Sequence, residues 1–171
     1  IMVLDLDVPH EPTLAALLPL LPVFLSYIHS FVFIVIYWNN HHHLLQATKQ
    51  VNGSVLWANL FLLFWLSLTP FVTAWMGESG FASWPVALYG GVLLMAAIAY
   101  FILARTLVAL QGTDSPLAVA LGNDVKGKIS PVIYLLAIPL AFVNPWISCA
   151  LYVLVAAMWL IPDRRIERTI S

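Results

Sequence analysis

The sequence has little charge and almost no cysteine. Only 9% of its 171 residues are charged and 62% are hydrophobic, whereas a soluble domain carries about a quarter charged residues. So few charges cannot cover the surface of a water-soluble globule. The net charge of −1 argues against a nucleic-acid partner. The single cysteine, Cys149, excludes an intrachain disulfide and a cysteine-based zinc site. These scarcities predict an integral, all-α membrane protein.

Long apolar runs indicate where the chain crosses the membrane. A membrane-crossing helix needs about 20 mostly apolar residues. The last apolar run is too long for one straight span, and Asn144-Pro145 splits it into a hairpin of two short helices. The predicted spans are residues 14–38, 54–76, 84–110, 129–143 and 145–161.

The chain begins with four apolar residues, Ile1 to Leu4, and Asp5 follows at once. Four residues cannot cross a membrane, and no basic segment precedes them as it would in a signal peptide. We interpret residues 1–8 as the end of a first helix whose beginning precedes this chain. A frayed apolar tail is the alternative. With that helix restored, the sequence predicts six spans in a single transmembrane domain, residues 1–171.

Charge placement predicts the orientation of the spans. If the loops alternate sides, the acidic residues Asp5, Asp7, Glu11 and Glu78 fall on one side, and all seven Lys and Arg residues fall on the other. Cytoplasmic loops of membrane proteins carry the excess of Lys and Arg. We therefore predict a multi-pass protein of the cell's inner (plasma) membrane with both termini in the cytoplasm.

Polar side chains gather at the cytoplasmic end of the first complete span, in Tyr37-Trp38-Asn39-Asn40-His41-His42-His43. Adjacent helical residues point about 100° apart, so no more than two of these histidines can share one ion, and no cysteine or nearby carboxylate completes a site. We expect no metal there. A neutral imidazole both donates and accepts hydrogen bonds, which suits a lock between helices. Near a water-filled path, the same histidines would sense pH.

Two further residues near the start of the next span extend this polar end. Trp57 fits the aromatic belt of a membrane interface, whereas the Asn59 amide needs a partner inside a membrane. The connection between the two spans is short, so they are antiparallel neighbours, and His41 or His42 reaches the depth of Asn59. The sequence thus predicts an interhelical polar network of His41, His42, Trp57 and Asn59.

Catalytic patterns are missing from the sequence. It has no paired carboxylates within a span, no nucleophile elbow and no phosphate-binding glycine loop. We therefore expect no enzymatic activity and no cofactor. His29 is the one ionisable group deep in a span, and a hydrogen bond to a neighbouring helix is a more common role for it than proton transport. The scarcity of intramembrane acids and bases weakens the case for a pump or antiporter.

Three blocks, in chain order, resemble one known family. They are Tyr37-Trp38-Asn39-Asn40-His41-His42, then Leu56-Trp57-Ala58-Asn59-Leu60, then Thr69-Pro70-Phe71 before Gly77-Glu78. The pattern is similar to bacterial members of the endolysosomal potassium-channel family, the transmembrane-protein-one-seven-five type, formerly a domain of unknown function. Asp5 to Pro9 also resembles the stretch that closes the family's first helix. The resemblance covers nearly the whole chain, and the Trp-x-Asn-His-His block is its most specific element.

The resemblance implies a homotetramer of six-helix subunits around a central pore, with potassium as the permeant ion. In such channels bulky apolar side chains on the first helix form the constriction. The family's Arg and Phe-Ser-Asp signature would lie before Ile1, so only outer pore-facing positions carry over, to Ile1 and Leu4 on one helical face. In the family, the Phe-Ser-Asp segment bonds to neighbouring helices. That role falls here on His41 or His42, Trp57 and Asn59.

An apolar constriction can gate by dewetting, and we hypothesise that it favours potassium as the more easily dehydrated cation. The acids Asp5, Asp7 and Glu11 would concentrate cations at the outer mouth by electrostatic focusing, or they only mark the translocated loop. Two other functions stay open. One is a small proton-coupled secondary transporter that uses His29 or the histidine triplet, and the other is a membrane scaffold without transport.

Overall fold

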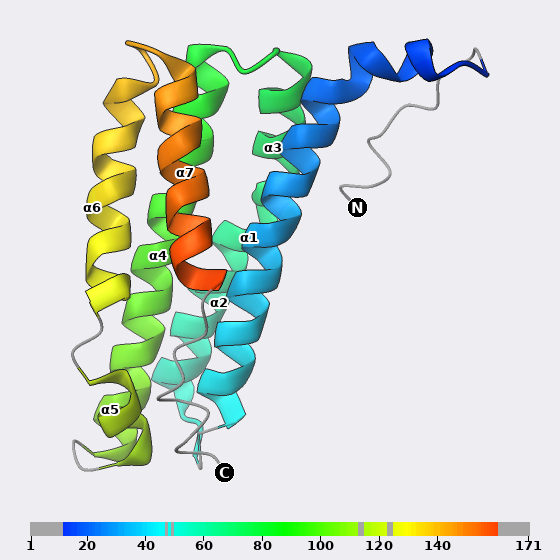
Figure 1. Ribbon diagram of the computed structural model, residues 1–171. Coiled ribbons are helices and arrows are strands. Elements are labelled where there is room, and N and C mark those ends of the chain that lie inside the picture. The colour runs from blue at the N-terminus through cyan, green and yellow to red at the C-terminus, as the bar shows by residue number, and fades with distance from the viewer. Residues whose placement is uncertain (1–11, 47, 49, 113–114, 123–124, 161–171) are drawn as a thin grey trace.

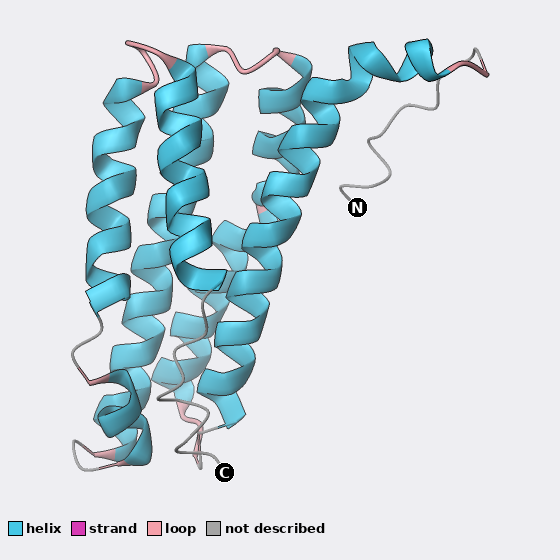
Figure 2. Ribbon diagram, in the orientation of Figure 1, coloured by secondary structure: helices cyan, strands magenta, loops and turns pink. Residues whose placement is uncertain are grey.

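The structure, a computed structural model, describes residues 12–46, 48, 50–112, 115–122 and 125–160. Within these ranges every regular element is a helix, and the helices stand side by side in a bundle (Figures 1 and 2). The predicted all-α architecture is therefore confirmed. The predictions for residues 1–8 and for Glu11 lie outside the described residues.

The apolar segment that begins the described part of the chain forms two helices and continues as helix beyond residue 38. Residues 14–20 form the 3-10 helix η2 (Leu14–Leu20), which leaves the bundle sideways (Figure 1), and α1 occupies Leu21–Gln46. Pro19 lies inside η2 and Pro22 lies in the first turn of α1, where a missing N–H breaks no helical hydrogen bond. Because α1 continues to Gln46, the polar stretch of residues 37–43 is helical throughout.

The second predicted span, residues 54–76, is divided into α2 (Gly53–Ser67) and α3 (Thr69–Glu78). Asn52 caps α2, since its Oδ1 accepts a hydrogen bond from the backbone N–H of Val55 at 3.0 Å. The division falls at Leu68, because Pro70 in the first turn of α3 has no N–H to donate back into α2. The two helices follow one another, and together they are long enough to cross a membrane.

Helix α4 (Ser83–Gln111) is the centre of the bundle and packs against α2, α3, α6 and α7. In its most apolar stretch 56% of the residues are buried, compared with 28% in α1 and 28% in α2–α3. Glycines allow close contacts. Gly90 of α4 lies directly under the hydroxyl of Tyr152 on α7, and Gly77 of α3 lies against Ser26 of α1. The core thus surrounds α4.

The polar linker predicted between the fourth span and the closing hairpin contains the short helix α5 (Pro116–Leu121). Ser115 caps it by accepting a hydrogen bond from the N–H of Ala118 at 3.2 Å. The closing hairpin consists of α6 (Val125–Leu140) and α7 (Pro145–Leu160). Each has 16 residues, so each is roughly 24 Å long, shorter than a hydrocarbon core of about 30 Å.

The two ends of the bundle carry opposite charges. Helix α3 ends at Glu78 at the upper end of Figure 1, whereas α4 ends and α6 begins at the lower end. Arg105 lies in the lower part of α4, and Lys126 and Lys128 lie in the first turn of α6. The acidic Glu78 thus lies at one end of the bundle and the three basic residues lie toward the other, as the alternation of loops predicts.

Candidate functional site

A hydrogen bond joins two of the four residues predicted for the interhelical polar network. Nε2 of His41, near the lower end of α1, lies 2.6 Å from Oδ1 of Asn59 in the second turn of α2. An amide oxygen only accepts hydrogen bonds, so Nε2 of the histidine donates this one. In the neutral ring, Nδ1 is then left as an acceptor. We call this contact the His41–Asn59 pair.

The other two residues of the predicted network lie outside this bond. His42 is exposed, and its ring meets the ring of His43 edge-on at a centroid distance of 5.9 Å. The Trp57 side chain is 75% exposed. Trp38, which was not included in the network, lies closer, with its ring 6.5 Å from the ring of His41. The structure thus selects His41 of the two candidate histidines and leaves Trp57 facing away from the bundle.

The successive histidines do not converge. His41 and His43 are half-buried and His42 is exposed, because successive side chains point in different directions around α1. In the described ranges, no three His, Cys, Asp or Glu side chains come close enough together to hold a metal ion.

A second polar cluster, which sequence reasoning missed, lies in the middle of the bundle. Oγ of Ser30 on α1 is 2.9 Å from the Tyr89 hydroxyl on α4 and 2.6 Å from Oγ1 of Thr73 on α3. Thr73 also donates to the carbonyl oxygen of Thr69 at 2.6 Å. All four residues are buried, so the cluster ties three helices together. The available signal was the spacing of Ser26 and Ser30, which places two hydroxyls on one face of an apolar helix.

His29 lies beside this cluster, among aromatic rings. The ring centroids of Phe33, Tyr89 and Tyr152 lie 5.1, 5.6 and 6.5 Å from its own. Its buried Nε2 has no hydrogen-bond partner in the part of the chain that the structure describes. The predicted bond to a neighbouring helix is therefore wrong for this nitrogen. The nearby hydroxyls are engaged elsewhere, Tyr89 with Ser30 and Tyr152 with the Val86 carbonyl.

Among the described residues, serines, threonines and tyrosines supply the buried hydroxyl groups, and His29 adds a buried ring nitrogen. The buried serines and threonines are Ser26, Ser30, Thr69, Thr73, Ser130 and Ser148. Ion-coupled transporters usually place acids and bases inside their spans. The hydroxyl groups of the described interior join helices to one another, and His29 is the base that lies beside them.

Comparison with known proteins identifies relatives along the whole chain. Residues 1–70 match the family model described as endosomal/lysosomal potassium channel TMEM175. A potassium channel of Chryseobacterium sp. (strain P1-3) is 53% identical over 171 residues, which are all of this chain and 89% of that relative. A potassium channel of Chamaesiphon minutus is 27% identical over 160 residues, covering 86% of this chain and 79% of the relative.

One solved structure has the same arrangement of helices. It is the crystal structure of a lysosomal potassium-selective channel TMEM175 homolog from Chamaesiphon minutus, with a TM-score of 0.80 and 24% sequence identity. The likeness covers 95% of this chain and 88% of that one. At this identity it is a likeness of fold.

Proposed function

The chain belongs to the TMEM175 family of endosomal/lysosomal potassium channels, and from this membership we propose that it forms a membrane pore through which potassium ions pass passively. The observation that carries the proposal is the 53% identity, along the whole chain, with a protein named as a potassium channel. The scarcity of acids and bases among the buried described residues, with His29 as the exception, supports passive conduction over ion-coupled transport, because coupling requires groups that change charge. The chain is not an enzyme, since its family consists of channels.

The pore would lie between copies of the chain. We propose a homotetramer around one axis, with the first helix innermost and Ile1 and Leu4 lining the outer part of an apolar constriction. Closed rotational symmetry is the default for assemblies of one chain. The described bundle supports this arrangement because only 28% of the residues in the most apolar stretch of α1, and 28% in that of α2–α3, are buried within the subunit.

The His41–Asn59 pair would help to hold the first helix. It lies at the lower end of α1 and α2, and Nδ1 of His41 is left to accept a hydrogen bond from outside the pair. In this proposal His41 takes the bonding role that the family resemblance implies for a histidine, and exposed Trp57 adds an aromatic contact. His42 is turned to the surface and serves only the membrane interface.

The lower end of the bundle would face the cytoplasm from the plasma membrane, and with the first helix restored both termini would lie on that side. Arg105, Lys126 and Lys128 lie toward this end, and positive charge accumulates on the cytoplasmic side of membrane proteins.

Reconstitution in liposomes tests the proposed function. With opposing potassium and sodium gradients, we expect a reversal potential that follows the potassium gradient and a current that grows linearly with driving force. The alternative, a small proton-coupled secondary transporter using buried histidines, would give saturating flux with a fixed proton stoichiometry. A scaffold would give no flux. Either result would overturn the channel.

The outer-mouth acids can be tested in the same liposomes. If Asp5, Asp7 and Glu11 focus cations, the variant Asp5→Asn/Asp7→Asn will carry a smaller inward potassium current at low ionic strength. The difference will disappear in high salt, because salt screens exposed charges over about 10 Å at 0.1 M. An unchanged low-salt current would mean that the acids only mark the translocated loop.

A further inference from the structure

Arg105 of α4 is a charged side chain that turns toward the membrane. The helix from Trp84, near the upper end of α4, to Arg105 is roughly 31 Å long, and a hydrocarbon core is about 30 Å thick. The guanidinium carbon lies 5.0 Å from the centre of the Phe101 ring, one turn higher on α4. Long side chains lean toward the N-terminus of their helix, which for α4 is the upper end (Figure 1). The positive charge is therefore held at the hydrocarbon boundary.

No carboxylate in the described ranges neutralises this charge. Glu78 is the one acidic residue there, and it lies at the opposite end of the bundle. Asp114 and Asp124 of the linker lie outside the described residues. The cation–π contact with Phe101 offsets part of the lost hydration, but a charge at membrane depth usually pairs with an opposite one. Because Arg105 is exposed, an anion can reach it from outside the bundle.

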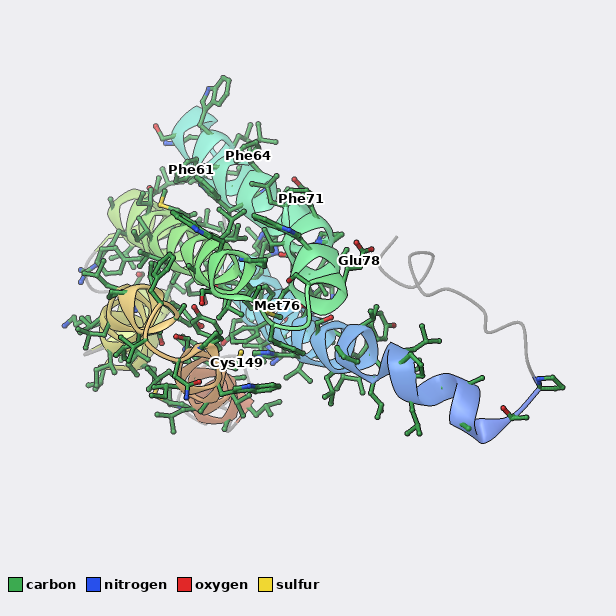
Figure 3. The ribbon with its side chains drawn as sticks, turned by 90° about the horizontal axis from the view of Figure 1, so that it is seen from above. Phe61, Phe64, Phe71, Met76, Glu78 and Cys149 are labelled. Carbon is green, nitrogen blue, oxygen red and sulfur yellow. The ribbon has the colours of Figure 1, made fainter. Side chains whose placement is uncertain are left out.

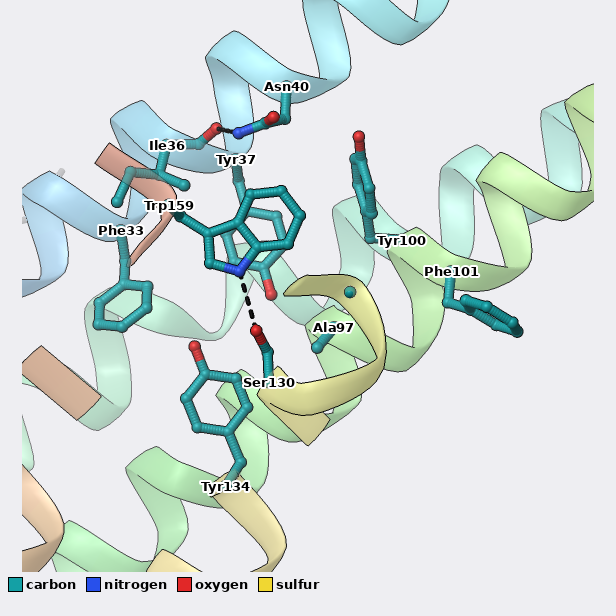
Figure 4. Close-up of a pocket in the computed structure, with 11 residues that line it drawn as sticks. Phe33, Ile36, Tyr37, Asn40, Ala97, Tyr100, Phe101, Ser130, Tyr134 and Trp159 are labelled. Carbon is teal, nitrogen blue, oxygen red and sulfur yellow. Dashed lines mark hydrogen bonds between the residues drawn. The ribbon is translucent and has the colours of Figure 1, made fainter. Parts of the chain in front are cut away.

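A second basic residue lies on the neighbouring helix. Phe101 of α4 and Gly127 of α6 line the same small pocket, so the two helices are adjacent at this level (Figure 4). We refer to the line along which they pack as the α4–α6 seam. Lys128 follows Gly127 directly and is exposed, as is Arg105. Two positive charges thus lie close to one level of the seam, on surfaces that face away from the subunit's own helices.

The helical rotation places both charges on the same side of the α4–α6 seam. Successive residues of a helix are rotated by about 100°, so Arg105 is turned about 40° from Phe101 and Lys128 about 100° from Gly127. The two rotations have the same sense, and α4 and α6 run in opposite directions. Rotations of one sense on antiparallel neighbours lead to the same side, which here is the outer surface of the bundle.

The outer surface above these two charges is apolar. Ile102 of α4 is 41% exposed, and Val132 and Leu135 of α6 are 56% and 62% exposed. Val132 and Leu135 lie four and seven residues after Lys128, so all three share one face of α6. A pair of cations at the membrane boundary is therefore followed, toward the membrane centre, by a wall of large aliphatic side chains.

We propose that the outer side of the α4–α6 seam binds one anionic phospholipid. Its phosphate would lie between Arg105 and Lys128, and an acyl chain would cover the apolar wall above them. A guanidinium holds a phosphate through two parallel hydrogen bonds, and an ammonium adds a point charge. Basic sites between membrane helices on the cytoplasmic side are typical binding sites for anionic headgroups.

Other occupants fit this surface less well. A zwitterionic headgroup would bring its own cation next to Arg105, and a free phosphate ion would leave the apolar wall uncovered. A second copy of the chain would need small residues or hydrogen-bonding groups for close packing, whereas Ile102, Val132 and Leu135 are large and apolar. Lipid binding depends on this surface alone, so it can be measured whether or not the protein conducts potassium.

The test compares phosphatidylglycerol with phosphatidylcholine of identical acyl chains, titrated into the purified protein in detergent with the first helix restored. The midpoint of thermal unfolding reports binding. We expect phosphatidylglycerol to bind with about tenfold higher affinity, and this ratio to fall in high salt, which screens exposed charges. Arg105→Gln/Lys128→Gln should bring the ratio close to one.

Lys126→Gln is the matched control, because it removes the same charge from the same turn of α6. Lys126 lies four residues before Ser130, whose hydroxyl accepts a hydrogen bond from Trp159 of α7 at 2.8 Å. It therefore belongs to the side of α6 that faces α7, and this variant should keep the preference. If the double variant does not fold, Arg105→Lys keeps the charge without the paired hydrogen bonds and should lower the preference about threefold.

Three results would overturn the proposal. Equal affinities of the two lipids for the wild type would indicate that a linker acid neutralises the charges or that another copy covers the seam. A preference that persists in Arg105→Gln/Lys128→Gln, or is unchanged in Arg105→Lys, would place the headgroup elsewhere. An equal loss of preference in Lys126→Gln would indicate an effect of net charge without a defined site.

Discussion

Two parts of the bundle, α4, α6 and α7 on the one hand and α2–α3 on the other, orient their aromatic side chains differently. Around α4, α6 and α7 the hydroxyl-bearing rings turn inward, and Tyr89 and Tyr152 are completely buried. On α2–α3 the large rings turn outward, with Phe64 54% and Phe71 63% exposed. Seen along the bundle, Phe64 of α2 and Phe71 of α3 lie at the outer face, whereas Met76 of α3 lies in the interior (Figure 3). Helices α6 and α7 also expose large aliphatic side chains, with Leu135 62% and Leu154 56% exposed, so both halves present apolar surface to lipid or to another chain.

The comparison shows what holds such helices together. Lipid tails are as apolar as leucine, so helices in a membrane gain little by hiding apolar surface from lipid. Close approach at small residues and hydrogen bonds between helices therefore decide which faces meet. Both are present around α4, where Tyr152 of α7 packs closely against Gly90 and Tyr89 forms a hydrogen bond with Ser30 of α1.

The largest effect expected at the contacts of α4 concerns Gly90. A methyl group added there would collide with the hydroxyl of Tyr152, which donates to the carbonyl oxygen of Val86 at 3.0 Å. We expect Gly90→Ala to lower the free energy of unfolding by about 1–3 kcal/mol, as measured by unfolding in detergent. The neighbouring Gly91→Ala is the control, because no atom lies within 4 Å of its added methyl. Similar losses in both variants would contradict the close contact between α4 and α7.

A smaller loss is expected at the junction of the two halves. Ser30→Ala removes the oxygen that joins Tyr89 to Thr73 and leaves a buried hydroxyl without its partner. The expected loss of stability is about 1–2 kcal/mol. Ser67→Ala is the matched control, since the Ser67 hydroxyl is exposed and bonds only the nearby Phe64 carbonyl. If both variants unfold alike, the cluster does not join the helices energetically.

The His41–Asn59 pair should affect conduction more than stability. Asn59→Leu removes the acceptor of a single half-buried hydrogen bond, worth about 1 kcal/mol. If the pair positions the first helix, the fraction of open channels will change about fivefold, which single-channel recording measures. Asn39→Leu, an exposed amide on α1, should leave the open fraction unchanged. Equal open fractions in wild type and Asn59→Leu would remove the pair from the gating proposal.

The smallest effect is expected on the outer face of α2–α3. Where lipid covers Phe64, Phe64→Ala will change the stability by no more than about 0.5 kcal/mol. Met76→Ala, at a buried position of α3, should lower the free energy of unfolding by about 2–5 kcal/mol. A loss above about 1 kcal/mol for Phe64→Ala would show that another copy of the chain covers this face.

Sequence patterns predicted the features that depend on neighbouring residues. Asn144-Pro145 indicated the turn between α6 and α7, and the structure places that turn at residues 141–144. The depth argument brought a histidine together with Asn59, and the bond is made by His41. The choice between His41 and His42 depends on the rotation of α1 against α2, which the packing of both helices sets. Local patterns carry no information about that rotation.

Other features could not be predicted because they depend on contacts between distant segments. The apolar run of residues 54–76 hides the division at Leu68, since Pro70 is compatible with the first turn of a helix. Ser30 and Thr73 could each bond their own helix carbonyls, as Ser26 does with Val23, so their meeting across 43 residues leaves no local signature. The pocket drawn in Figure 4, lined by Phe33, Tyr100, Tyr134 and Trp159 among others, likewise takes its wall from four helices.

Because η2 leaves the bundle sideways, a movement of the segment before it would act on α1 from the side. Its seven residues, at a rise of about 2 Å each, extend roughly 14 Å from the top of α1. The segment ending at Thr13 therefore joins α1 through a lever arm and not through an axial extension of the helix. A sideways displacement of η2 would act on the first turn of α1, where Pro22 and Val23 pack against Gly77 of α3.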